Sequence, residues 1–232
     1  MTDISEEQLG TQLEVMLSMQ DALNRVVIPD WLNRNLAWHR AIYVEAAEYL
    51  EHLGTWKWWK KGSPDFPQAN MELVDIWHFG LSWYLNAYSA KGESFASTPN
   101  FLIRQDIRSS KAIEPLSADE QVASEQRHRA VDELVASAGL GSFCMNAFMR
   151  LLAYSGMDFD ALYQRYVGKN VLNRFRQENG YKTGEYVKVW DGLEDNEHLN
   201  KLLADLPADV LLPDRVHAGL TALYAACVKS KT

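Results

Sequence analysis

The sequence predicts an all-α protein built as a helical bundle, and two observations support this fold class. Apolar residues recur at helical spacing along nearly the whole chain, as Leu9, Leu13 and Met16 do near its start. Ser, Asp, Gly and Pro residues stand where such helices would begin and end. No internal repeat or Gly/Ser-rich linker divides the chain, so we expect a single all-α domain over residues 1–232.

The first two helices carry boundary signals of their own. Ser5 and Gln8 form a capping box before the first helix, and Pro29 ends that helix. The second helix is expected to begin near residues 33–35 and to continue until Gly54 stops it.

The third helix is predicted from its apolar content. Glycine and prolines within residues 55–68, including Pro67, separate it from the second helix. We expect it to run from about Ala69 to Ala90 and to end before Gly92. Apolar residues cover most of its circumference, which is typical of a helix buried at the centre of a domain.

The middle of the chain is less regular. Residues 91–117 show no clear periodicity, and we expect the stretch 91–130 to contain a long excursion that is mobile or contacts a dimer partner. Ser117 and Glu120 then predict a capping box before a helix that reaches about Ala138.

The remaining elements are also mostly helical. A short apolar helix is expected to end at Tyr154, and Asp158 caps a helix that continues to about Asn179. Alternation over residues 185–190 predicts a short strand or extended segment, and a final helix begins near Pro213.

Composition and charge exclude several classes of protein. The chain has 23 Lys and Arg against 31 Asp and Glu, for a net charge of −8, so a protein that grips long nucleic acid is disfavoured. No run of about 18 apolar residues predicts a membrane span, and the polar start of the chain predicts no secretory signal. Cys144 and Cys227 match no metal or disulfide pattern and are expected to be reduced thiols. We expect a cytoplasmic protein with neither a membrane nor a long nucleic acid as partner.

Two pairs of carboxylates are the strongest chemical signal. Glu45 and Glu48 lie three apart on the second helix, and Glu72 and Asp75 lie three apart on the third. Each pair therefore shares a helical face, and consecutive antiparallel helices would bring all four acids together. Four oxygen donors suit Mg²⁺, with Mn²⁺ as a substitute. A solvated helix face is the alternative for any one such pair. Glu48 and Glu51 are spaced in the same way, so spacing alone leaves open which pair of the second helix is used.

A basic and aromatic loop follows the second helix. It contains Lys57, Trp58, Trp59 and Lys60, whose ammonium groups could reach phosphate and whose indoles could stack on a base. The alternative is that the rings pack on the domain and the lysines are solvated. Most of the tryptophans fall within residues 31–83, which predicts an aromatic wall around one site.

A second polar cluster lies later in the chain. Lys169, Asn173 and Arg176 share one helical face, and Tyr181 and Lys188 follow in the next loop. Cations gathered in an acidic protein indicate a local anion site, with an exposed basic helix face as the alternative.

These motifs together resemble the dimeric all-α dUTPases, within the all-α NTP pyrophosphatase superfamily. The resemblance rests on ExxE, 23 residues, ExxD, the WKWWK loop and the segment KNVLNRFRQENGYKTGEYVKVWDGLEDN. It covers roughly residues 10–85 and 160–200. It implies a homodimer that hydrolyses dUTP to dUMP and pyrophosphate, with dUDP open as a second substrate.

The resemblance also implies roles for individual residues. Mg²⁺ would be bound by Glu45, Glu48, Glu72 and Asp75, with Glu45 and Glu48 as the catalytic acids. Uracil would be read by Gln20 and Asn24, and the base flanked by Trp58 or Trp59. Phosphates and sugar would be held by Lys169, Asn173, Arg176, Tyr181 and Lys188. For Gln20 and Asn24 the alternative is two exposed polar residues on an amphipathic helix.

The expected mechanism is attack of water on the α-phosphorus, with Glu45 accepting the proton of that water. One rival is an all-α pyrophosphatase of another NTP such as dCTP. Another is a di-iron carboxylate oxidase, which needs Glu-x-x-His on two helices, whereas Asp75-x-x-His78 is the nearest match here. A third is a helical interaction protein without catalytic activity.

Overall fold

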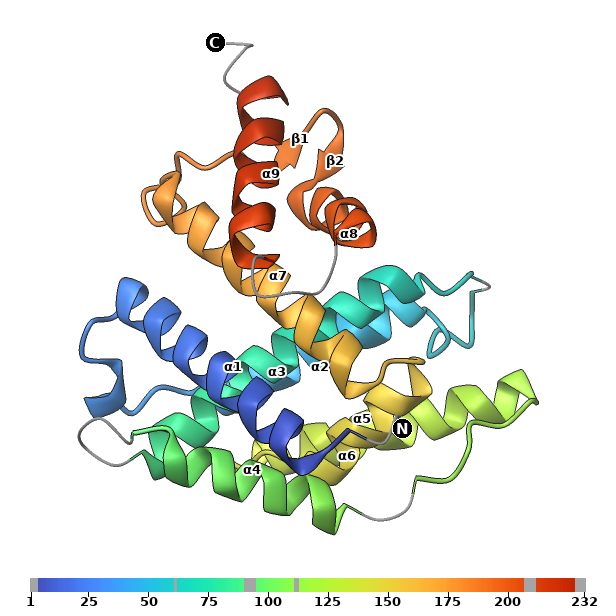
Figure 1. Ribbon diagram of the computed structural model, residues 1–232. Helices are drawn as coiled ribbons and strands as arrows, with labels where there is room; N and C mark the ends of the chain where they lie inside the picture. The colour runs from blue at the N-terminus through green and yellow to red at the C-terminus, as the bar shows by residue number, and fades with distance from the viewer. Residues whose placement is uncertain (1–3, 61, 90–94, 111–112, 207–211, 228–232) are drawn as a thin grey trace.

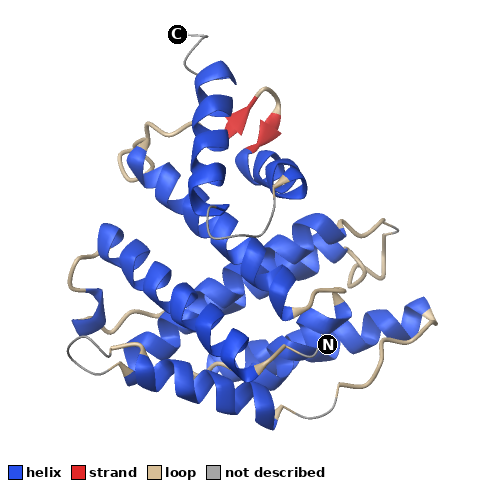
Figure 2. Ribbon diagram, in the orientation of Figure 1, coloured by secondary structure: helices blue, strands red, loops and turns tan. Residues whose placement is uncertain are grey.

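The computed structural model describes residues 4–60, 62–89, 95–110, 113–206 and 212–227. Most of these residues are helical, and the strands found among them form one short hairpin (Figures 1 and 2). The prediction of an all-α fold is confirmed.

The elements follow one another in a simple order. They are α1 (Glu6–Val27), the 3₁₀ turn η1 (Trp31–Asn33), α2 (Trp38–Leu53), α3 (Phe66–Tyr88), α4 (Ser97–Ser109), α5 (Glu120–Gly139), α6 (Met145–Tyr154), α7 (Phe159–Glu178), β1 (Val189–Trp190), β2 (Leu193–Glu194), α8 (Asp195–Asp205) and α9 (Leu212–Cys227).

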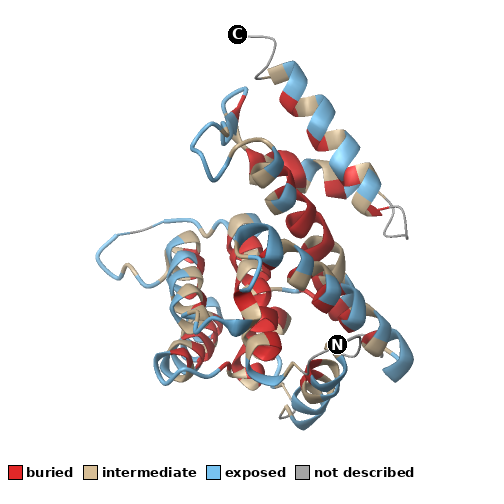
Figure 3. Cartoon of the chain, turned by 90° about the vertical axis from the view of Figure 1, so that its left-hand side faces the viewer, coloured by how far each residue is buried: buried red, intermediate tan, exposed pale blue. Residues whose placement is uncertain are grey.

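Helix α3 lies at the centre of the bundle, as its composition predicts. It packs along α2 and also contacts α1, α4 and α7. Leu73, Trp77 and Leu81 are among its many fully buried residues. The buried residues of the neighbouring helices turn toward this centre (Figure 3).

Helices α2 and α3 run antiparallel, which places their acid pairs side by side. At one end the rings of Trp38 and Phe79 are 6.3 Å apart, and at the other the amide of Asp65 donates to the carbonyl of His52 over 2.9 Å. Gly54 ends α2 in the left-handed conformation at φ 64°, where a side chain would be strained.

Two boundaries of this helix pair differ from the sequence prediction. Helix α2 begins at Trp38, because the chain before it forms the η1 turn. Helix α3 begins at Phe66, with Asp65 as its cap and Pro67 in the first turn, where a proline is tolerated since its missing N–H has no helical partner. It ends at Tyr88, and Gly92 lies outside the described residues.

The expectation of an irregular excursion is wrong for residues 97–109, which form α4. This helix buries only Pro99 and Ile103, so little of it faces the core. It packs against α1, where Arg104 and Arg108 pair with Glu6. Contacts with a distant part of the chain therefore add to the stability that the local sequence gives this helix.

The start of α5 also differs from its prediction. The cap is Asp119, whose carboxylate accepts hydrogen bonds from the amides of Gln121 and Val122 over 2.9 and 3.1 Å. Ser117 instead accepts a hydrogen bond from the amide of Asp119, so its hydroxyl stabilises the turn before the helix.

Helix α7 connects the bundle to the C-terminal elements. Asp158 caps it, as predicted, by accepting from the amide of Ala161 over 2.8 Å. Its first half contacts α1 and α3, and α8, α9 and the hairpin gather on its other half (Figure 1). Within the predicted segment 185–190 only Val189–Trp190 pairs as a strand.

None of the described helices combines the length and apolarity needed to cross a membrane.

Candidate active site

Three of the four predicted carboxylates converge between α2 and α3. Oxygens of Glu45, Glu72 and Asp75 all lie within 4.8 Å of one another, as the antiparallel packing requires. Glu72 is buried, and the other two are partly buried. Glu48 lies one turn along α2, exposed and outside this group, so its role as a metal ligand stays a prediction.

The acid cluster (Glu45, Glu72 and Asp75) is electrostatically strained. Burial, followed by the charges of Asp75 and Glu72, raises the pKa of Glu45 to about 8, and the two glutamates share a side-chain hydrogen bond. Burial and the charge of Asp75 also raise the pKa of Glu72. A divalent cation fits this cluster, because it would replace the shared proton and neutralise acids that repel one another.

The raised pKa of Glu45 predicts a pH-dependent stability of the metal-free protein. The folded state favours the protonated carboxyl, so this contribution is complete below the ordinary pKa of 4.5 and is lost as pH rises through about 8. Melting temperatures measured in chelator should fall across this window, and Mg²⁺ should reduce the fall. Glu45→Gln should flatten the profile, and a wild-type profile already as flat as that of the variant would contradict the prediction.

A buried lysine provides the positive charge nearest to the acid cluster. Lys169 on α7 is 2% exposed, and its ammonium lies 2.8 Å from Asp75. The same ammonium donates to the side-chain oxygen of Asn196 over 2.9 Å. The alternative of an exposed basic face is wrong for this residue.

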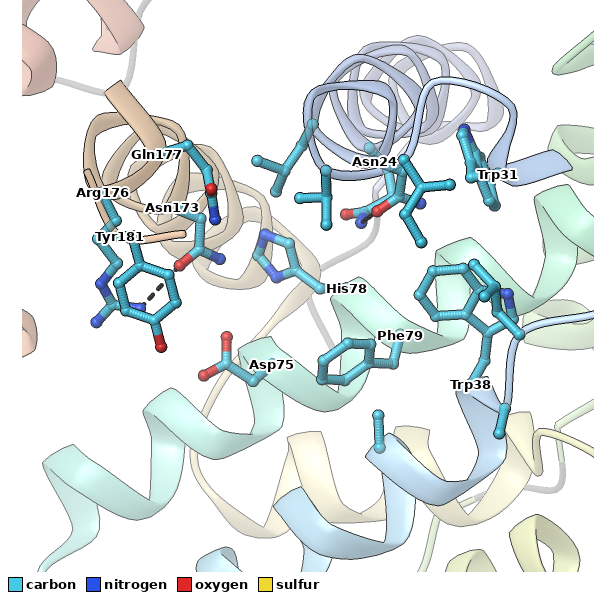
Figure 4. A pocket seen from close by; sticks show the side chains of 17 residues that line it. Asn24, Trp31, Trp38, Asp75, His78, Phe79, Asn173, Arg176, Gln177 and Tyr181 are labelled. Carbon is cyan, nitrogen blue, oxygen red and sulfur yellow. Dashed lines mark hydrogen bonds between the residues drawn. The ribbon is translucent and has the colours of Figure 1, made fainter. Parts of the chain in front are cut away.

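An elongated cavity of about 440 Å³ begins beside the acid cluster. Asp75, Asn173, Arg176 and Tyr181 line its polar end, and Trp31, Trp38 and Phe79 line its apolar end (Figure 4). An apolar cavity with a few directed polar groups is the usual form of a small-molecule site.

Gln20 and Asn24 both line this cavity and are buried, so the alternative of exposed polar residues is wrong. The amide of Gln20 donates to Asn24 over 3.0 Å, and the amide of Asn24 donates to the hydroxyl of Ser82 over 3.0 Å. The Tyr166 hydroxyl lies 2.8 Å from the side-chain oxygen of Gln20. These contacts hold both amides in fixed orientations, as recognition of a base edge requires.

Lys188 and the loop residues lie away from the cavity. Lys188 pairs with Glu194 over 2.9 Å and is half exposed. Trp58 is 89% exposed and packs edge to face on Trp59, which is 58% exposed. An aromatic wall therefore forms only in part, since Trp31 and Trp38 line the cavity whereas these two do not.

The loop lysines lie beside a second cavity, and Lys57 pairs with Glu51 there. Lys57 and Lys60 line a smaller cavity of about 150 Å³ together with His52. The His52 ring nitrogen lies 3.4 Å from a Glu72 oxygen, which connects this cavity to the cluster. The substrate-binding roles of these lysines and tryptophans stay predictions.

His78 is a cavity residue whose role the sequence does not reveal. One ring nitrogen lies 2.8 Å from the Val74 carbonyl, and the ring stacks on Tyr166 at 4.2 Å. Burial lowers its pKa to about 4, so the ring is neutral. It is not part of the acid cluster found among the described residues, and that cluster contains oxygen ligands alone, which disfavours the di-iron alternative.

The fold and the site define a class of protein. An acid cluster suited to divalent cations, a buried lysine beside it and an adjoining apolar cavity with fixed amides are the parts of an all-α enzyme that acts on a phosphorylated small molecule. A family model described as dUTPase matches residues 12–181, and the chain belongs to this family, whose activity is hydrolysis of dUTP. No curated protein matches the chain.

Proposed function

We propose that the protein hydrolyses dUTP to dUMP and pyrophosphate in a Mg²⁺-dependent reaction, with water attacking the α-phosphorus. The observation that carries this proposal is the position of the cavity. Its polar end includes Asp75 of the acid cluster, and its lining includes Gln20 and Asn24. A nucleotide whose base lies among the amides would therefore have its phosphates near the carboxylates.

The acid cluster, with Glu48 as a fourth ligand, would hold the metal ions. The ligands are oxygens alone, which favours Mg²⁺ and allows Mn²⁺. Bound Mg²⁺ lowers the pKa of water and neutralises charge on phosphate oxygens.

The side chains of the chain supply the remaining steps. Glu45 accepts the proton of the attacking water, a role supported by its place in the acid cluster next to Asp75, which lines the cavity. Lys169 stabilises charge on the phosphates from its buried position next to Asp75, and Tyr181 contributes from the wall of the cavity. Arg176 lines the same cavity but is bonded mainly to Asp195, and Lys188 would contribute only after leaving its pair with Glu194. Lys57 and Lys60 would act from the loop, with Trp58 or Trp59 moving to cover the base.

Base selection is the next property to test. Gln20 and Asn24 present amide groups held by Tyr166 and Ser82, and such groups complement the alternating acceptors and donor of uracil. With Mg²⁺, the purified protein should release pyrophosphate from dUTP with a kcat/KM at least about 10-fold above that for dCTP. Equal rates for dUTP and dCTP would contradict the uracil assignment, and preference for dCTP would favour the rival pyrophosphatase. The rate with dUDP measures separately whether the diphosphate is also cleaved.

We also propose that the protein acts in the cytoplasm as a homodimer. The resemblance of the sequence to the dimeric all-α dUTPases supports the proposal of a dimer. Light scattering coupled to size-exclusion chromatography should give a mass near twice 26.5 kDa.

A further inference from the structure

Asp195 is a fully buried carboxylate that lies outside the part of the chain matched by the family. It is the first residue of α8. Its two oxygens accept hydrogen bonds from Nε and Nη2 of Arg176, each over 2.8 Å, and one of them also accepts from the Tyr186 hydroxyl over 2.8 Å. A bidentate pair of this kind fixes both the position and the plane of the guanidinium.

Arg176 has few N–H groups left that could donate hydrogen bonds to a substrate. Besides the two bonds to Asp195, its Nη1 donates to the side-chain oxygen of Asn173 over 2.9 Å, and its Nη2 donates to that of Asn196 over 3.3 Å. Of the five N–H groups that arginine offers, one on Nη1 has no acceptor within the described parts of the chain. Arg176 is thus engaged mainly in holding neighbouring side chains.

The bond to Arg176 determines how the Asn173 side chain is oriented. A guanidinium only donates, so the amide atom that faces it must be the oxygen. The NH₂ group of Asn173 is then the end directed toward His78 and the cavity (Figure 4). The site presents a hydrogen-bond donor at this position, which suits a carbonyl or hydroxyl oxygen of a nucleotide.

We propose that Asp195 is a positioning residue of the nucleotide site, which acts through Arg176 to hold the Asn173 amide with its NH₂ group toward the ligand. This inference deepens the proposed function and rests on it. Asp195 does not line the cavity of the site, whereas Arg176, which it holds, and Asn173, which Arg176 orients, both line it.

The pKa shifts of Asp195 and Arg176 support an ion pair between them. Burial would raise the pKa of Asp195, but the hydrogen bonds and charge of Arg176 outweigh it, and the pKa is lowered. Burial would likewise lower the pKa of Arg176, but Asp195 reverses that shift. Both groups are therefore charged at neutral pH, and the hydrogen bonds between them are charge-assisted.

The test measures steady-state kinetics with dUTP and Mg²⁺ in a double-mutant cycle. Asp195→Asn and Asn173→Ala should each raise KM by about 10-fold or more with a much smaller change in kcat, because the acid cluster is untouched. In the Asn173→Ala background, Asp195→Asn should raise KM by less than about twofold, because its effect passes through Asn173. If Asp195→Asn does not fold, Arg176→Lys replaces it, since lysine retains the charge but cannot hold both partners.

Asp106→Asn is the matched control. Asp106 also accepts a tyrosine hydroxyl, that of Tyr84, but it lies on α4 away from the cavity, so KM should not change. Equal KM increases from Asp195→Asn in both backgrounds, or no increase at all, would overturn the positioning role. A wild-type protein that neither hydrolyses dUTP nor binds a non-hydrolysable analogue would overturn the proposed function together with this inference.

Discussion

Glu72→Gln is expected to lower dUTP hydrolysis by more than about 100-fold while stabilising the metal-free protein. Glu72 is buried in the acid cluster and shares a hydrogen bond with Glu45. The amide keeps the size of the side chain but removes one charge and one strong metal ligand. Because the pKa of Glu72 is raised, the fold favours its neutral form, and glutamine mimics that form.

The two effects are measured separately. Pyrophosphate release reports activity, and melting temperature in chelator at pH 8 should be higher for Glu72→Gln than for the wild type. Added Mg²⁺ should stabilise the wild type and have little effect on the variant. Glu125→Gln, which alters an exposed pair with Arg129, should change neither property. A Glu72→Gln protein with full activity would remove the acid cluster from the mechanism.

Lys169→Met is expected to abolish most activity. Unlike Glu72→Gln, it should destabilise the metal-free protein, by about 3–5 kcal/mol. Methionine fills a similar volume but leaves Asp75 without the ammonium that lies 2.8 Å away. The carboxylates would then repel one another without a buried counter-charge. Glu72→Gln and Lys169→Met should therefore change stability in opposite directions. This pair of results tests the electrostatics of the acid cluster more sharply than loss of activity alone.

Mg²⁺ should recover part of the stability lost in Lys169→Met, because the cation supplies the charge that the lysine provided. Chemical denaturation with and without Mg²⁺ measures this recovery. Lys201→Met, at an exposed position on α8, is the control and should behave as the wild type. Equal stability of Lys169→Met and the wild type in chelator would show that this lysine does not neutralise the cluster.

The acid cluster was accessible to sequence analysis because its geometry is mostly local. A three-residue spacing places two side chains on one helical face whatever the surroundings. A short connection between α2 and α3 then leaves antiparallel packing as the simple arrangement, and Glu45 meets Glu72 and Asp75 as expected.

Helix α4 and the cap of α5 show where local reasoning fails. Helix α4 packs on α1, where Arg108 pairs with Glu6 about a hundred residues away, and no window of sequence contains that contact. Ser117 has the spacing of a capping residue, yet Asp119 caps the helix. Asp119 lies immediately before the first turn, where its carboxylate reaches the free amides of Gln121 and Val122.

The sequence by itself determined the helical class, the acid pairs, and the face that carries Lys169 and Arg176. Helical periodicity is a property of neighbouring residues, so it can be recognised without the tertiary structure. Tertiary structure alone decided that Gln20 and Asn24 are buried in the same cavity as Asn173, and that Asp195 holds Arg176. These contacts arise where α1, α3, α7 and α8 pack together. Their partners are far apart in the chain, so packing of the helices, and not spacing along them, brings the side chains into contact.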